Sequence, residues 1–186
     1  MLKLIPILAL ALVTATTLLR GRRVRSESGI SAWAFRDARG GQRVTGLLFA
    51  LLVVALGIAA ALIATDDAEG LNLMAGAFLS FAGAATVIVA QIQMGAAWRV
   101  GVRDHDAPLF VTAGLFGFSR NPIFVGMILM AAGIALSAQI LWVSTAAVAF
   151  TVVCALQVRV EEAHLSRAFG EAYAAFCRTT PRWLLF

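Results

Sequence analysis

Arg120, Asn121 and Pro122 stand together at the start of a long apolar stretch, where they could both begin a helix and bind an anion. Asn is a common helix N-cap and Pro fits the first helical turn, so the triplet predicts a helix that begins at Pro122. The N–H groups of that turn carry partial positive charge, to which Arg120 adds a full charge. A carboxylate or phosphate could bind there, although a plain helix start whose arginine reaches the lipid headgroups also explains the triplet.

Glu161 and Glu162 form a second polar pair at the far end of the same apolar region. Two adjacent carboxylates at a membrane boundary could bind a cationic ligand. Alternatively, Glu162 pairs with Arg159 one helical turn earlier, which would only stabilise the helix. Apolar residues then recur at helical spacing and predict an amphipathic helix on the membrane surface: Leu165, Phe169, Tyr173 and Phe176.

The composition is that of an integral membrane protein. Of the 186 residues, 61% are hydrophobic and 13% are charged, with a mean hydropathy of +0.88, whereas soluble domains carry about 25% charged residues. The net charge of +5 comes mostly from arginines that flank apolar segments. It therefore indicates membrane topology and contact with anionic headgroups rather than with nucleic acid. Two cysteines and two histidines show no metal-site spacing, so we expect no metal.

The apolar segments predict an all-α bundle of about five transmembrane helices, plus a cytoplasmic amphipathic helix at the C-terminal end. The first three spans are 4–19, 44–64 and 71–94. Residues 122–158 would make a helix of about 55 Å, too long for one crossing, so we expect a hairpin that turns near 136–139. The first span is expected to be a retained helix rather than a cleaved leader, because several arginines follow it directly: Arg20, Arg22, Arg23 and Arg25.

Charge alternates along the connections and predicts an orientation. The connection 20–43 is rich in arginine, 65–70 is acidic, and both 95–120 and the tail after 158 are basic. The positive-inside rule then places the N-terminus outside and the C-terminus in the cytoplasm, as in a bacterial inner membrane. We expect one membrane domain over 1–186, with three spans and a basic loop in 1–94, and a polar loop, the hairpin and the C-terminal helix in 95–186.

The two polar groups belong to a longer pattern. The stretch "VTAGLFGFSRNPIFVG", an apolar hairpin and then "EEAHLSRAFGEAYAAFCRTTPR" resemble the isoprenylcysteine carboxyl methyltransferase and phospholipid methyltransferase superfamily. The signature reads Gly-x-Tyr/Phe, Arg-His/Asn-Pro-x-Tyr/Phe-x-Gly, then Glu-Glu, Phe-Gly-x-x-Tyr and a closing Pro-Arg. The match covers about the last 80 residues, and its combined spacing is specific although each piece alone is weak.

The resemblance implies a small helical membrane enzyme that binds S-adenosylmethionine at its cytoplasmic side, with 95–186 as the methyltransferase core. Arg120 and Glu162 are expected to face the reacting centre as catalytic residues. Glu161 is expected to bind a polar group of the cofactor, and Phe116 to pack on its adenosine. The full set of cofactor-binding residues that the resemblance implies is Leu109, Phe110, Val111, Phe116, Asn121, Pro122, Ile123, Phe124 and Glu161.

Two departures from the family pattern bear on the methyl acceptor. Asn121 replaces the His of the commoner form, a variant that resembles the phospholipid-methylating members. Gln157 stands where isoprenylcysteine enzymes place a substrate-binding Arg, which argues against a prenylated-cysteine carboxylate. The expected acceptor is a hydrophobic or lipid-like molecule that enters from the bilayer, with a lipid amine, a thiol and other small acceptors all open.

Two other functions fit parts of the sequence. A membrane reductase that uses a nicotinamide cofactor would share a related helical C-terminal region, but the short tail after Pro181 argues against it. A non-catalytic membrane protein could use the same pocket to bind a lipid or a partner. The retained Arg120, Glu161 and Glu162 favour the methyltransferase.

Overall fold

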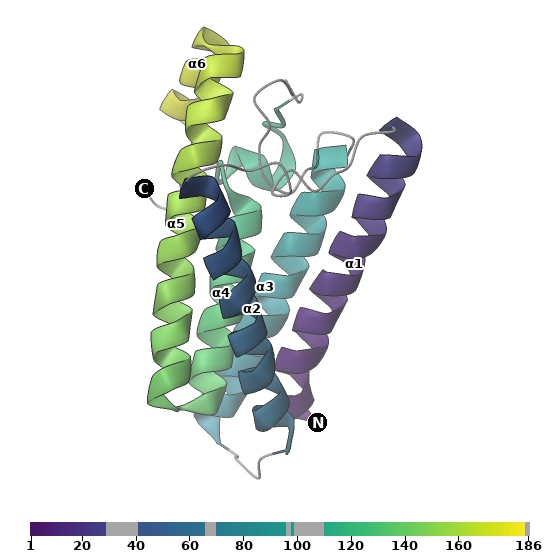
Figure 1. Cartoon of the computed structure of the whole chain (residues 1–186), viewed down its shortest axis with the longest axis vertical. Helices are drawn as coiled ribbons and strands as arrows, with labels where there is room; N and C mark the ends of the chain where they lie inside the picture. Colours follow the sequence, from purple (N-terminus) through teal and green to yellow (C-terminus); the bar gives the residue numbers. More distant parts are fainter. Residues whose placement is uncertain (29–40, 66–69, 96–97, 99–109, 185–186) are drawn as a thin grey trace.

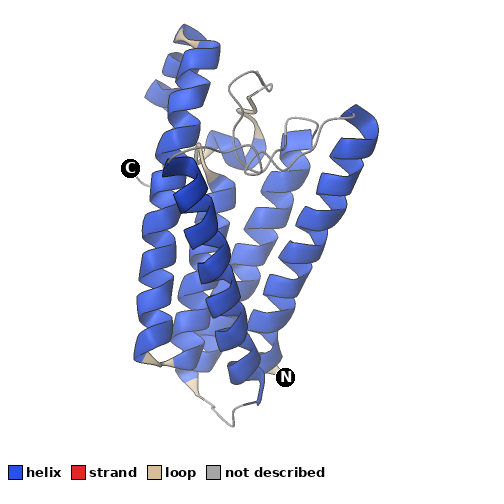
Figure 2. Ribbon diagram, viewed as in Figure 1, coloured by secondary structure: helices blue, strands red, loops and turns tan. Residues whose placement is uncertain are grey.

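The computed structural model describes residues 1–28, 41–65, 70–95, 98 and 110–184, and every regular element in these ranges is a helix (Figure 1, Figure 2). The predicted all-α fold is therefore confirmed. Two short 3-10 segments, η1 (Leu2–Leu4) and η4 (Gly114–Gly117), precede α1 and α4. The helices are α1 (Ile5–Ser28), α2 (Gly41–Thr65), α3 (Leu71–Met94), α4 (Pro122–Ala138), α5 (Leu141–Phe169) and α6 (Glu171–Thr179).

Among the described residues, four helices are long and apolar enough to cross a membrane, namely α1, α2, α3 and α5. α4 is also apolar but has 17 residues, about 26 Å of helix against a hydrocarbon core of about 30 Å. α5 has 29 residues and reaches about 43 Å, more than one crossing requires. A helical membrane bundle of four long apolar helices and a shorter fifth agrees with the prediction.

Consecutive helices run antiparallel, and the end of α1, the start of α2, the end of α3, the start of α4 and α6 lie at one end of the bundle (Figure 1). The N-terminus, the end of α2, the start of α3 and the turn between α4 and α5 lie at the opposite end. The turn consists of Gln139, which has φ +53°, and Ile140. The predicted hairpin is therefore present, and its turn lies at the C-terminal edge of the expected stretch 136–139.

α3 and α4 pack with their backbones almost in contact, because glycines face each other between them. A Cβ atom built on Gly126 of α4 would lie 2.6 Å from the carbonyl oxygen of Gly83 on α3. One built on Gly76 would lie 2.5 Å from the carbonyl oxygen of Gly133. Small residues allow this close approach, which gains van der Waals contact where lipid gives no hydrophobic drive. The contact fixes α4, and with it the Arg120–Pro122 triplet, against α3.

The predicted amphipathic helix over 165–176 is interrupted, which corrects the sequence-based expectation. α5 runs without a break to Phe169, and Gly170 adopts φ +51° before α6 begins at Glu171. This left-handed conformation is accessible to glycine at little cost, so Gly170 allows the chain to turn between the two helices. The apolar stripe is consequently shared between the last turns of α5 and the separate helix α6.

Gly83→Ala should destabilise the protein, because the added methyl would lie 2.5 Å from the carbonyl oxygen of Gly126 and 2.7 Å from the amide nitrogen of Met130. Both atoms belong to helix backbone, so we expect a loss of about 1–3 kcal/mol. Gly57→Ala on α2 is the control, because its methyl would meet only the flexible end of Leu10 at 3.5 Å. Thermal unfolding in detergent compares the two, and equal midpoints would contradict this packing.

Candidate active site

The carboxylate of Glu162 connects three segments that are distant in the sequence. Its Oε1 accepts hydrogen bonds from Arg120 Nε at 3.2 Å and from Asn121 Nδ2 at 3.1 Å, both just before α4. Its Oε2 accepts from Arg182 in the C-terminal tail, with Nε at 2.8 Å and Nη2 at 2.7 Å. The side chains of Arg120 and Glu162 are only 11% and 10% exposed, so little water screens this pair. The predicted alternative pairing of Glu162 with Arg159 is replaced by these contacts.

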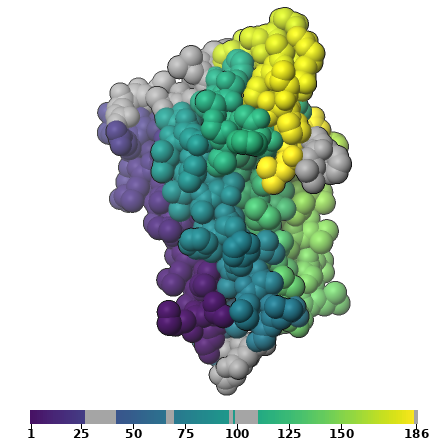
Figure 3. Space-filling view, turned by 180° about the vertical axis from the view of Figure 1, so that it is seen from behind, coloured from purple at the N-terminus to yellow at the C-terminus, as the bar shows by residue number. Residues whose placement is uncertain are grey.

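Arg120 holds the end of α6 and the C-terminal tail, here residues 180–184, through its backbone and its guanidinium. Its N–H donates to the carbonyl oxygen of Pro181 at 2.9 Å. Its Nη1 donates to the carbonyl oxygens of Thr180 at 2.7 Å and Cys177 at 3.1 Å. The tail therefore folds back against the start of α4, and from behind the yellow C-terminal segment lies against the green part of the chain that contains η4 (Figure 3).

The side chains of Ser119 and Asn121 complete this attachment. Ser119 Oγ donates to the carbonyl oxygen of Arg182 at 3.1 Å, and Asn121 Nδ2 donates to the same oxygen at 3.2 Å. The hydrogen bond to Glu162 raises the pKa of the Arg182 guanidinium, so that this residue stays charged. The tail is thus fixed at both its backbone and its charged side chain.

Asn121 does not cap α4 with its side chain, contrary to the prediction from the sequence. Pro122 is in the first turn as predicted, and Asn121 occupies the N-cap position, but its amide is used by Glu162 and the tail. No side chain among the described residues caps the helix. The first N–H groups of α4 have no partner within the helix, so this helix start keeps the capacity to bind an anion.

A cavity of about 100 Å³ lies beside this network. Its walls contain nearly all the predicted site residues: Phe110, Val111, Phe116, Arg120, Asn121, Pro122, Ile123, Phe124 and Glu161. Leu109 lies outside the described residues. Glu162 holds Arg120 and Asn121 from one side and is not among the lining residues. The structure therefore brings the two predicted polar groups into one pocket, with Glu161 as the carboxylate on its wall.

Glu161 and Glu162 differ sharply in their partners, since successive residues of a helix point about 100° apart. Glu161 accepts a hydrogen bond from Gln157 Nε2 at 3.2 Å, one turn earlier. Gln157 is buried, and its Oε1 lies 3.5 Å from the Thr45 hydroxyl of α2, which orients the amide. In contrast to Glu162, Glu161 meets no arginine in these contacts, so it is available to a cationic or hydroxyl-bearing ligand.

Aromatic rings also line the pocket, and they cluster around Phe110. The ring of Phe110 is 4.7 Å from that of Phe169, 5.9 Å from that of Tyr173 and 5.8 Å from that of Phe176, centroid to centroid. Burial raises the pKa of Tyr173, so its phenol stays protonated. Of the stripe that the sequence predicts on the membrane surface, Leu165, Tyr173 and Phe176 line the pocket instead. Phe169 is not a lining residue but packs on Phe110.

Gln93 at the end of α3 positions the loop that carries Phe116. Its Oε1 accepts a hydrogen bond from the Leu115 N–H at 2.8 Å. Gly114 adopts φ +66°, and a Cβ there would lie 2.5 Å from the Gln93 amide, so a larger residue would push the loop away. Phe116 is 7% exposed and faces the pocket.

Sequence reasoning missed several residues of this site: Gln93, Met94, Ser119, Leu165 and Arg182. Arg182 could have been found from the sequence, because it belongs to the Pro-Arg pair that closes the family pattern. Gln93 could also have been found, as a polar residue at the end of an apolar span. Ser119 is engaged by the tail that folds back, which no local pattern encodes. Met94 and Leu165 line the pocket from α3 and α5, where an apolar residue looks the same whether it faces a pocket or the helical core.

Comparison with known proteins adds an independent result. The model of the phospholipid methyltransferase family matches residues 71–172, more than half of the chain. The chain belongs to this family. The family is part of the integral membrane methyltransferase superfamily, so the resemblance seen in the sequence is confirmed. No curated protein and no solved structure matches the chain.

Family membership makes the chain a membrane methyltransferase and favours methyl transfer over the reductase alternative. The matched residues run from the start of α3 to the start of α6, and they include η4, α4 and α5. α1, α2 and the tail that carries Arg182 lie outside the match. The pocket therefore combines residues of the family region with Tyr173 and Phe176 of α6, which follow it.

Arg182→Ala should loosen the tail and lower the free energy of unfolding by about 1–2 kcal/mol, because Glu162 loses its hydrogen bonds to Arg182. Arg178→Ala is the control: its partner Glu171 is 81% exposed, and such surface pairs contribute about 0.5 kcal/mol or less. Hydrogen exchange of residues 180–184, together with thermal unfolding, measures both effects. Equal behaviour of the two variants would contradict the role of Arg182.

Proposed function

We propose that this membrane methyltransferase uses S-adenosylmethionine and methylates a lipid-like acceptor at the cytoplasmic face of the membrane. The observation that carries the proposal is the pocket, which is lined by a carboxylate, a helix start without a side-chain cap and aromatic rings. These groups are complementary to a molecule that carries a carboxylate, an ammonium group and an aromatic base. The family match independently supports methyl transfer.

The lining residues divide by chemistry into groups that suit different parts of the cofactor. The start of α4 offers the backbone N–H groups of Ile123 and Phe124 to a carboxylate. Pro122 has no N–H and the Asn121 N–H donates to Ser119 Oγ at 3.1 Å, so these two residues are proposed to contact the cofactor through their side chains. Glu161 offers an acceptor to an ammonium or a ribose hydroxyl. Aromatic and apolar side chains offer packing surface for the adenosine and, through ring faces, for the sulfonium; in the pocket they are Phe110, Val111 and Phe116. The family pattern adds Leu109, which lies outside the described residues.

Arg120 and Glu162 are proposed to act at the reacting centre. When bound, S-adenosylmethionine supplies an electrophilic methyl group, so the protein contributes mainly positioning and electrostatics. Glu162 holds the Arg120 guanidinium at the edge of the pocket, and the tail carbonyls fix its other end. Arg120 can then attract an anionic group of the acceptor, such as a phosphate.

A phospholipid amine is the acceptor that we favour. Asn121 matches the form of the motif found in phospholipid-methylating members. The family model that matches the chain is named for phospholipid methyltransferases. An amine that enters protonated must lose its proton before it is methylated. Glu161 lies on the pocket wall and is the acid better placed to accept this proton. Both oxygens of Glu162 already accept hydrogen bonds, so Glu162 could accept the proton only after one of its donors moved away.

We also propose that the polar end of the bundle faces the cytoplasm of a bacterial cell, with the N-terminus outside. Arg20, Arg22, Arg23 and Arg25 lie near the end of α1, at the same end of the bundle as the site (Figure 1). The acidic connection 65–70 joins α2 to α3 at the other end of these helices. This distribution agrees with the positive-inside rule.

Calorimetric titration of S-adenosylhomocysteine, the demethylated cofactor, into detergent-purified protein tests the pocket. We expect saturable binding that weakens about tenfold or more in Glu161→Gln, because a hydrogen bond to a charged group contributes about 1.5–3 kcal/mol. Glu171→Gln is the control, since Glu171 is exposed and is not among the pocket residues. A folded wild type that binds no S-adenosylhomocysteine, or binds only a nicotinamide dinucleotide, would overturn the proposal.

Arg120→Lys separates the reacting centre from cofactor binding. Lysine keeps the charge but cannot donate at once to Glu162 and to the two tail carbonyls. We expect methyl transfer to fall about a hundredfold, because small misplacements of a positioned group can cost that much. Affinity for S-adenosylhomocysteine should stay within about threefold, the size of a lost weak contact. A variant with unchanged turnover would contradict the assigned role of Arg120.

A further inference from the structure

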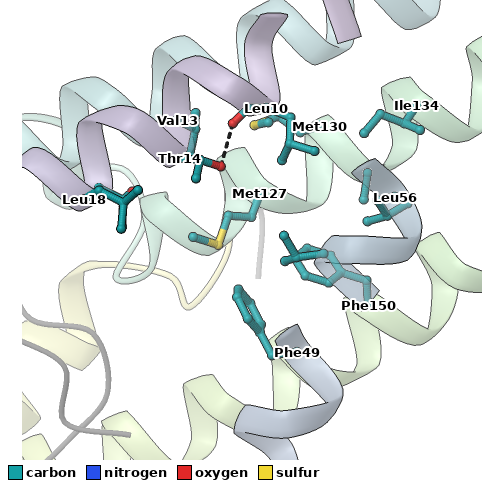
Figure 4. Close-up of a pocket in the computed structure, with 13 residues that line it drawn as sticks. Leu10, Val13, Thr14, Leu18, Phe49, Leu56, Met127, Met130, Ile134 and Phe150 are labelled. Atoms are coloured by element: carbon teal, nitrogen blue, oxygen red, sulfur yellow. Dashed lines mark hydrogen bonds between the residues drawn. The ribbon is translucent and has the colours of Figure 1, made fainter. Parts of the chain in front are cut away.

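An apolar cleft of about 220 Å³ lies beneath the polar pocket, between α1, α2, α4 and α5. Figure 4 shows Leu18 of α1, Phe49 of α2 and Met127 of α4 toward the left end of the cleft, with Leu56 and Ile134 farther along at the right. The cleft is distinct from the polar pocket, with which it shares no lining residue. Apolar cavities of about 150 Å³ stay dry and bind apolar guests, so a cleft of this size and lining suits a hydrocarbon.

The polar groups in the cleft are already engaged within the protein. The Thr14 hydroxyl donates to the carbonyl oxygen of Leu10 at 2.8 Å, one turn earlier. The Thr17 hydroxyl accepts from Gln91 Nε2 of α3 at 2.8 Å, which also ties α1 to α3. The remaining lining side chains are apolar. A polar ligand would therefore lose its hydrogen bonds to water here without replacement, whereas a hydrocarbon chain would lose none.

One face of α4 leads from the polar pocket into the cleft. Ile123 lines the pocket, whereas Met127, Met130 and Ile134 line the cleft at helical spacing on the same face. Ile123 and Met127 are about 6 Å apart along the helix axis. A molecule with its polar group at Ile123 would thus have its apolar part beside Met127.

The dimensions fit one chain of a lipid. From Met127 to Ile134 the cleft extends about 10 Å along α4, out of roughly 15 Å that one leaflet of the hydrocarbon core provides. α1 and α2 approach each other near the N-terminus and diverge toward the polar end (Figure 1). Their residues form one side of the cleft, and both helices lie outside the region that the family model matches.

We propose that this cleft binds an acyl chain of the acceptor lipid while its headgroup occupies the polar pocket. The proposal rests on the proposed function for the headgroup, but it concerns a separate set of residues. α1 and α2 then determine which lipids are accepted by the length and bulk of the chain. The hydrophobic effect of chain burial, about 0.8 kcal/mol per methylene, contributes affinity that a headgroup at the water boundary cannot supply alone.

Two matched pairs of α1 variants test the cleft. Leu18 and Leu19 are adjacent and exposed, at 48% and 62%, but only Leu18 lines the cleft. Thr14 and Ala15 are likewise adjacent and exposed, and only Thr14 lines it. Leu18→Trp and Thr14→Phe should fill the cleft, whereas Leu19→Trp and Ala15→Phe add the same bulk toward lipid. All four positions are at the protein surface, so each variant is expected to fold.

The measurement is native mass spectrometry of the purified protein titrated with dioleoyl phosphatidylethanolamine, without cofactor. We expect the wild type and both control variants to bind this lipid alike. Leu18→Trp and Thr14→Phe should bind it about tenfold more weakly, the factor lost when roughly two methylenes leave an apolar site. Equal lipid binding by cleft and control variants would overturn the proposal.

A parallel titration with S-adenosylhomocysteine separates this proposal from the proposed function. If all variants bind S-adenosylhomocysteine equally and lipid binding is also equal, the methyltransferase pocket stands and the acyl-chain site falls. If none binds S-adenosylhomocysteine but the cleft variants lose lipid, the cleft stands as a lipid site and the proposed function falls.

Discussion

The carboxylate of Glu162 is the contact on which the polar end of the molecule depends. It accepts hydrogen bonds from residues just before α4 and from the C-terminal tail, and it lies on α5 itself. Losing any of these donors destabilises the polar end, because it leaves a charge with fewer partners in a poorly solvated site. The pocket, the position of Arg120 and the fold of the tail are consequently coupled through one side chain.

The helices below this network form two parts, a tightly packed α3–α4 pair and an apolar wall made by α1 and α2. α3 and α4 pack through facing glycines, so the helix start that lines the pocket has a fixed position and little freedom to shift. α1 and α2 lie outside the family region, and between them and α4 they leave an apolar cleft. With the proposed lipid acceptor, a rigid core that holds the polar pocket, beside an apolar wall from other helices, would let the same reaction act on lipids with different chains.

Local rules in the sequence predicted much of this arrangement. Pro122 begins a helix as its fixed φ requires, and the combined spacing of the two polar groups indicated the family. Elsewhere the local rules gave the wrong result or none, because contacts between distant parts of the sequence determine the structure there. Asn121 would cap α4 by propensity through its side-chain oxygen. Instead its Nδ2 donates to Glu162 Oε1 and to the Arg182 carbonyl oxygen, and these two hydrogen bonds fix the orientation of the side chain. The helical spacing of Phe169, Tyr173 and Phe176 continues across Gly170, so the sequence pattern did not indicate that the helix ends there. No local pattern predicts the hydrogen bond between Arg182 and Glu162, because these residues belong to different segments.

Transfer of a labelled methyl group from S-adenosylmethionine to lipid is the most direct test of the account. Purified protein would be reconstituted in vesicles of phosphatidylethanolamine and phosphatidylcholine and incubated with methyl-labelled S-adenosylmethionine, and the lipid fraction would then be extracted and counted. The account predicts that the label enters the amine lipid in proportion to protein and time. Label that stays in the aqueous phase, with protein that is folded and binds S-adenosylhomocysteine, would contradict a lipid acceptor.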